Sequence, residues 1–185
     1  MSEEGGLKFA AAEVNLVLHA TEDEGKVLKA IEEMLMVPAT RFSRSSSEGH
    51  YKNKILLQKA ILSSKEAALL AKRIISLLNS ADREHLSRLI DDYADEKGNL
   101  YIRLDKQRIC QGRVSLSETD AIRIRFKPIR RFRPSETVHN YMSLFHPNFA
   151  KWINETFLLL YELEKHIGPD NMVAKLHIER RRHFF

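Results

Sequence analysis

The densest group of residues that could do chemistry is the basic segment Arg123–Arg133. It reads Arg-Ile-Arg-Phe-Lys-Pro-Ile-Arg-Arg-Phe-Arg, so six of its eleven residues are cationic and none is acidic. In a strand, alternation would place its first three cations on one face, about 6–7 Å apart, close to the phosphate spacing of a nucleic acid strand. The segment therefore predicts contact with a nucleic acid backbone; the alternative is a solvated face balanced by carboxylates from elsewhere. The candidate contacts are Arg123, Arg125, Lys127, Arg130, Arg131 and Arg133.

A second group lies in the polar stretch 40–53, which we read as a short strand followed by a hairpin-like loop. Beside a basic sheet, this loop could act as a clamp on RNA, and otherwise it is an ordinary hairpin tip. Its candidate contacts are Arg44, His50, Tyr51 and Lys52.

The third group is Asp105-Lys106-Gln107, which follows an alternating strand directly. Lys106 could meet a phosphate as a point charge, and Gln107 could hydrogen-bond a base edge or a ribose hydroxyl. The alternative is structural, with Asp105 capping a turn.

The distribution of charge agrees with an anionic partner. Met1 to Asp95 contain 13 Lys and Arg against 15 Asp and Glu, whereas Glu96 to Phe185 contain 17 against 10. Nucleic acid is the first expectation for such a partner and an anionic membrane surface the second. A solvated basic face is the alternative reading.

The motifs of common catalytic sites are missing from the sequence. The eight histidines show no zinc-ligand spacing, and there is no glycine-rich phosphate loop or nucleophile elbow. The acidic group Asp91-Asp92 with Asp95 could hold magnesium in a nuclease, but such groups are more often solvated helix ends. We therefore expect no enzyme activity, no metal and no cofactor.

Hydrophobic periodicity predicts the elements that position these groups. Strands are expected around 13–19, 54–62, 100–104 and 122–127, and helices after Thr21, Ser63 and Ser80. Thr21 with Glu24, and Ser63 with Glu66, have capping-box spacing. The order predicts an α+β fold: a mostly antiparallel sheet with helices on one face, followed by a helical C-terminal extension.

The expected domains are 1–133, an α+β RNA-binding domain, and 134–185, a mainly helical extension. A long helix is expected from Pro147 to His166, apolar over more of its circumference than a surface helix needs. This favours a second hypothesis, a protein–protein adaptor or oligomerisation module. Its candidate contacts are Trp152, Phe157, Leu160 and Tyr161.

Cys110 is the single cysteine, which favours a reducing compartment. The start of the chain lacks an apolar signal region, and no apolar run is long enough to span a bilayer. A cytoplasmic location is expected, with no membrane partner.

Three segments resemble an archaeal family of small RNA-binding proteins described as predicted exosome-associated subunits. They are Glu13–Val27, the loop Gly49-His50-Tyr51-Lys52-Asn53 with Ile55, and Tyr101–Gln107 leading through Gly112 to Asp120. The resemblance covers residues 7–128. It implies a fold like the ribosomal protein that binds the small RNA of the large subunit, RNA binding without a catalytic residue, and nothing about 129–185. Where the family has a second glycine in the loop, this chain has Lys52.

Residues and resemblance together predict a non-catalytic RNA-binding protein, an accessory subunit of an RNA-processing or ribosome-associated assembly, and the RNA expected as its partner is structured or ribosomal.

Overall fold

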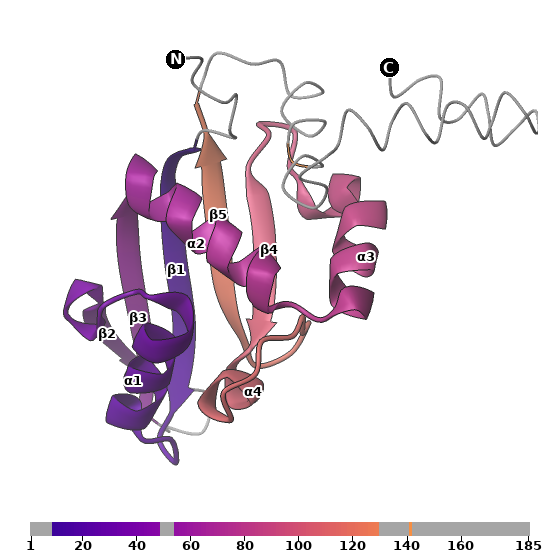
Figure 1. Cartoon of the computed structure of the whole chain (residues 1–185). Helices are drawn as coiled ribbons and strands as arrows, with labels where there is room; N and C mark the ends of the chain where they lie inside the picture. Colours follow the sequence, from indigo (N-terminus) through magenta and orange to yellow (C-terminus); the bar gives the residue numbers. More distant parts are fainter. Residues whose placement is uncertain (1–8, 49–53, 130–140, 142–185) are drawn as a thin grey trace, which may run out of the picture. The chain divides into compact units, whose positions relative to one another are not determined.

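The computed structural model describes residues 9–48, 54–129 and 141, which form an α+β arrangement (Figure 1). The expected order of strands and longer helices is confirmed, and the short helix after β4 was not expected. The elements are β1 Phe9–His19, α1 Glu24–Leu35, η1 Ala39–Arg41, β2 Ser43–Glu48, β3 Lys54–Ser63, α2 Ser64–Leu77, α3 Ser80–Arg88, η2 Ile90–Tyr93, β4 Leu100–Asp105, α4 Lys106–Cys110 and β5 Ala121–Pro128.

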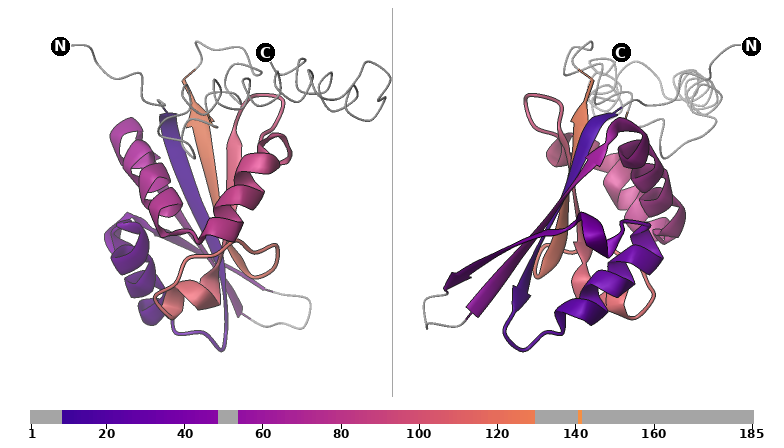
Figure 2. Two further views of the ribbon diagram at one scale, coloured as in Figure 1. Left: turned by 45° about the vertical axis from the view of Figure 1, so that its right-hand side comes forward. Right: turned by 90° about the vertical axis from the view of Figure 1, so that its left-hand side faces the viewer.

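The five strands form one sheet in the order β2-β3-β1-β5-β4, and every neighbouring pair is antiparallel. The helices lie on one face of this sheet, as its edge-on view shows (Figure 2). The predicted fold class is therefore confirmed for the described residues. The other face has no helix of the described residues over it.

The core lies between the sheet and the helices. Residues that face each other in an antiparallel pair point to the same side, so Ala60, Val14, Ile124 and Ile102 form one row across four strands. Each of the four is at most 1% exposed. The alternation in β5 is therefore fixed by burial, because a register slip of one residue would turn its arginines into the core.

Capping boxes were expected at the N-termini of α1 and α2. At α2 the prediction is confirmed, since the Ser63 N–H donates to Glu66 Oε2 at 2.8 Å and the reciprocal bond is present. At α1 it is wrong, because the N-cap is Asp23, whose Oδ1 accepts from the Lys26 N–H at 3.1 Å.

Tyr141 belongs to the same compact unit as the sheet. Tyr141 lies in the unit Met1–Leu144, and the domain boundary expected after residue 133 stays a prediction because residues 130–140 lie outside the described ones. Tyr141 is 1% exposed, stacks on Phe9 with ring centres 5.9 Å apart, and donates its hydroxyl to the Gly98 carbonyl at 2.5 Å.

The tail helix expected from Pro147 to His166, with Trp152, Phe157, Leu160 and Tyr161, lies outside the described residues. Among the described helices, none has the length and apolar character needed to cross a bilayer.

Candidate nucleic-acid interface

The sheet face turned away from the helices, called here the open face, collects cations from three strands. The predicted separation of the two faces of β5 is confirmed: Ile122, Ile124 and Phe126 are buried, while the basic residues between them point outward. The open face also receives one cation from β3 and one from β4, and neither was among the expected contacts. Its basic residues are Lys59, Arg103, Arg123, Arg125 and Lys127.

The strand register makes these cations neighbours. Arg123 lies opposite Asn15 of β1 on one side and opposite Arg103 of β4 on the other, and Asn15 lies opposite Lys59 of β3. Adjacent strands are about 4.7–4.9 Å apart. The open face therefore has a row of cations running across the strands as well as one running along β5.

Glu13 of β1 sits among three of the cations. Its carboxylate accepts from Arg125 Nη2 at 2.7 Å and from Lys127 Nζ at 2.6 Å, and lies 3.7 Å from Lys59 Nζ. Burial by itself would raise the pKa of the Glu13 carboxyl, but hydrogen bonds from Lys127 and Arg125 outweigh it and hold the pKa at about 2. One carboxylate thus stays charged among three cations, which leaves this cluster net positive.

Sequence reasoning missed Glu13 because its partners are distant in the chain. The basic segment contains no acid of its own, and the balancing carboxylate comes from a neighbouring strand. The alternation of Glu13 and Asn15 with Val14 and Leu16 indicated an outward Glu13. Which strand lay beside it could not be read from that pattern.

Arg103 has an ion-pair partner among the described residues, and Arg123 has none. Arg103 Nη1 forms an ion pair with Glu118 Oε2 at 2.5 Å. Arg123 is exposed, and no described residue forms an ion pair or hydrogen bond with its guanidinium. Among the described arginines of β5, Arg123 is therefore the one most available to an external anion.

Tyr101 provides an aromatic ring beside these cations. It lies opposite Arg125, and its hydroxyl donates to Asp95 Oδ2 at 3.0 Å. Asp95 also accepts from the backbone N–H groups of Lys97 and Asn99, so the phenol is held by a fixed turn. The ring remains 38% exposed and can offer a face to a base.

On the open face, β3 carries apolar side chains on both sides of Lys59. Leu57 is 40% exposed and Ile61 is 59% exposed, and Ile61 lies opposite Glu13. The open face therefore places hydrophobic side chains next to cations, an arrangement suited to a ligand with charged and apolar parts.

Lys106 requires a correction. Its side chain is 1% exposed, and its ammonium contacts Glu22 Oε2 at 2.7 Å, Asp120 Oδ1 at 2.6 Å and the Val17 carbonyl at 2.8 Å. All three N–H donors of the ammonium are thus used inside the protein, so Lys106 is not available to a phosphate. Glu22 and Asp120, with His19, could otherwise form a metal-ligand group, and the Lys106 ammonium supplies the positive charge there.

The neighbours of Lys106 are also structural. Asp105 is the N-cap of α4, with its Oδ1 accepting from the Arg108 N–H at 2.9 Å. Gln107 Nε2 donates to Glu22 Oε1 at 3.1 Å and approaches Asp120 Oδ2 at 3.4 Å. Gln107 remains exposed, but its amide is engaged at this cluster rather than on the open face.

Arg44 does not join the β5 cations. It lies opposite Gln58, whose side chain faces the helices, and its Nη1 is 3.6 Å from Glu24 Oε2 of α1. The expected clamp therefore does not include Arg44, because it is on the helix side of β2. The other loop candidates His50, Tyr51 and Lys52, and the basic residues Arg130, Arg131 and Arg133, lie outside the described residues.

The Asp91 carboxyl, part of the acidic group considered for magnesium, and the thiol of the single cysteine both have raised pKa values. Asp91 and Asp92 lie in η2, and burial, followed by repulsion from Asp92, raises the pKa of the Asp91 carboxyl. Cys110 is exposed, and partial desolvation by its neighbours, with the charge of Glu22, raises the pKa of its thiol. A raised thiol pKa is the opposite of what an activated nucleophile needs.

The chain matches a protein family described as RNA binding over residues 11–128. It belongs to this family. The RNA-binding protein PAB1135 of Pyrococcus abyssi is 34% identical over 129 residues, which cover 66% of this chain and 84% of that protein. The uncharacterized protein MJ0213 of Methanocaldococcus jannaschii is 31% identical over 117 residues, covering 59% of this chain and 76% of that protein.

Solved structures of similar proteins support the fold. Protein AF2318 of Archaeoglobus fulgidus is 28% identical with a TM-score of 0.63, covering 74% of this chain and 99% of that one. Mth689, a DUF54 protein from Methanothermobacter thermautotrophicus, is 25% identical with a TM-score of 0.62, covering 75% of this chain and 99% of that one.

Proposed function

We propose that this protein binds RNA through the open face of its sheet, with the cations of β5 and Lys59 of β3 holding the phosphate backbone. The observation that carries this proposal is the Glu13 cluster: one carboxylate faces Arg125, Lys127 and Lys59, so positive charge remains. Arg123 adds a guanidinium without a described partner. Backbone contacts of this kind are electrostatic and independent of sequence.

The protein would act as a non-catalytic accessory subunit of an RNA-processing or ribosome-associated assembly in the cytoplasm. Family membership and the relative named an RNA-binding protein support the RNA, and the resemblance noted above motivates the assembly. Contact with another protein would use the tail residues Trp152, Phe157, Leu160 and Tyr161.

The test compares the salt dependence of RNA affinity in three proteins: wild type, Arg123→Ala and Lys72→Ala. Lys72 is an exposed cation on α2, in the helix layer, so its loss changes the net charge equally on the other side of the sheet. Fluorescence anisotropy with a labelled single-stranded RNA would be measured from low to high salt. We expect Arg123→Ala to lower the slope of log affinity against log salt by about 0.7–0.9, the loss of one phosphate contact.

Lys72→Ala should leave that slope unchanged. Both substitutions are at exposed positions and should change the free energy of unfolding by less than about 0.5 kcal/mol. Equal slopes for wild type and Arg123→Ala, in proteins with the same melting curve, would exclude Arg123 from the interface. A lower slope in Lys72→Ala alone would place the RNA on the helix layer.

A further inference from the structure

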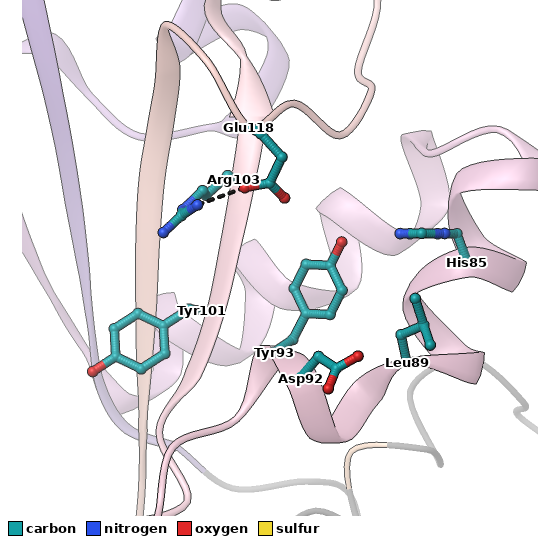
Figure 3. Close-up of a pocket in the computed structure, with 7 residues that line it drawn as sticks. All are labelled: His85, Leu89, Asp92, Tyr93, Tyr101, Arg103 and Glu118. Atoms are coloured by element: carbon teal, nitrogen blue, oxygen red, sulfur yellow. Dashed lines mark hydrogen bonds and ion pairs between the residues drawn. The ribbon is translucent and has the colours of Figure 1, made fainter.

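A pocket of about 290 Å³ lies at the β4 edge of the sheet, next to the open face (Figure 3). Tyr101 and Arg103 of β4 line one part of it, and Tyr93 of η2 and His85 of α3 line another. The Tyr93 ring meets the His85 ring edge-on, with centres 6.3 Å apart. Aromatic rings from separate elements thus converge on one recess.

The charge of this pocket differs from that of the rest of the interface. Glu118 and Asp92 contribute two carboxylates to the lining, against the single guanidinium of Arg103. Burial raises the pKa of the Tyr93 hydroxyl, and the nearby carboxylates of Glu118 and Asp82 raise it further. Such surroundings disfavour a phosphate and favour a group that donates hydrogen bonds, such as the edge of a base.

One carboxylate oxygen of Glu118 has no hydrogen-bond donor among the described residues. Its Oε2 takes the bond from Arg103, and no described group donates to its Oε1. Figure 3 shows Glu118 and Arg103 side by side at one end of the pocket, with the Tyr93 ring between them and His85. The pair therefore presents a carboxylate acceptor beside guanidinium donors, near the Tyr93 ring.

The pocket is continuous with the cations of the open face. Arg103 lies opposite Arg123, and Tyr101 lies opposite Arg125. Because neighbouring strands are about 4.7–4.9 Å apart, a nucleotide whose phosphate contacts β5 can extend its base over β4. Unpaired bases are commonly bound this way, stacked on aromatic rings and hydrogen-bonded along an edge.

We propose that this pocket binds an unpaired guanine of the RNA. Among the four bases, guanine has two adjacent donors, N1–H and the N2 amino group, which Glu118 can accept with Oε1 and with the second lone pair of Oε2. Guanine also has an O6 acceptor for Arg103. The inference rests on the proposed function, since the phosphates of the same strand would lie on β5. It adds a preference for one base to binding that is otherwise independent of sequence.

The test uses short oligouridines with one central position changed to guanine, inosine or adenine, titrated by anisotropy. Wild type should bind the guanine oligonucleotide about tenfold more tightly than the adenine one, within the range for one bidentate base contact. Inosine, which lacks the N2 amino group, should fall between them. Glu118→Gln should reduce the guanine-to-adenine ratio to near one.

The control is Glu84→Gln, the same chemical change on an exposed residue of α3 that does not line the pocket. Both variants lose one negative charge, so each should bind the adenine oligonucleotide somewhat more tightly. Only Glu118→Gln should also lose the guanine-to-adenine preference, which Glu84→Gln should keep. Glu118 is 72% exposed, and its variant should melt like wild type.

Steep salt dependence with equal affinity for guanine and adenine would overturn the guanine site and leave the proposed function standing. A guanine preference retained by Glu118→Gln would also overturn it. Affinity that does not depend on salt for any oligonucleotide would overturn the proposed function and this site together.

Discussion

Glu13 on β1 and Arg125 on β5 lie directly opposite each other, and Arg125 Nη2 donates to the Glu13 carboxylate at 2.7 Å although the residues are 112 positions apart in the chain. Lys127 donates to the other carboxylate oxygen at 2.6 Å. The basic strand is thus attached to its neighbour by a charged contact on the open face, while the apolar residues of both strands pack on the other side.

The first prediction concerns the pH dependence of this contact. The Glu13 pKa is lowered from 4.5 to about 2 in the folded protein, which corresponds to about 3 kcal/mol of stability. A lowered folded pKa means that this contribution is complete above pH 4.5 and is lost as the pH falls toward 2. Glu13→Gln should therefore be less stable than wild type at pH 7, and the gap should shrink in that acidic window. Urea unfolding of wild type and Glu13→Gln, followed by circular dichroism, measures the difference in stability at each pH. A difference that does not change with pH would contradict the lowered pKa of Glu13.

A second prediction separates the buried lysine from the RNA surface. Lys106→Met leaves Glu22 and Asp120 without their shared cation, and removing one partner of a buried ion pair costs about 3 kcal/mol. Because Asp120 is 40% exposed, the loss should be at the lower end of such values. RNA affinity and its salt slope, measured at a temperature where the variant is folded, should match wild type. A smaller slope of log RNA affinity against log salt in the folded variant would show that Lys106 contacts the RNA.

The third prediction concerns Tyr141. Its hydroxyl donates to the carbonyl of Gly98, which is itself buried. Tyr141→Phe keeps the stacking on Phe9 but leaves that carbonyl unsatisfied, at a cost of about 1–3 kcal/mol. Tyr141→Ala also removes the ring and should cost about 3–5 kcal/mol. Thermal unfolding should give a lower melting temperature for Tyr141→Ala than for Tyr141→Phe. Equal melting temperatures for the two variants would show that the ring does not contribute to stability.

Local patterns in the sequence predicted much of this fold. The alternation Ile122, Ile124, Phe126 identified the buried side of β5, and the spacing of Ser63 and Glu66 identified the start of α2. Both signals depend on residues within a few positions of one another, where strand and helix geometry determine the direction of each side chain.

The candidate site was predicted only in part because its contacts join distant segments. Nothing near Arg125 in the sequence reveals Glu13, and nothing near Lys106 reveals Glu22, 84 positions away. The pocket was missed for the same reason, since Tyr93 and Glu118 come together only once η2 packs beside β4. Register and packing between elements bring these residues together.

The most direct test of the central claim is to map the RNA contact by NMR. Backbone amide shifts of the labelled protein would be followed while a short single-stranded RNA is added at low salt. We predict that the largest shifts fall on β5 and β4, around Arg123, Arg125 and Arg103, and that α1 and α2 change little. Shifts concentrated on α1 and α2, with β5 and β4 unaffected, would contradict the assignment of the RNA to the open face.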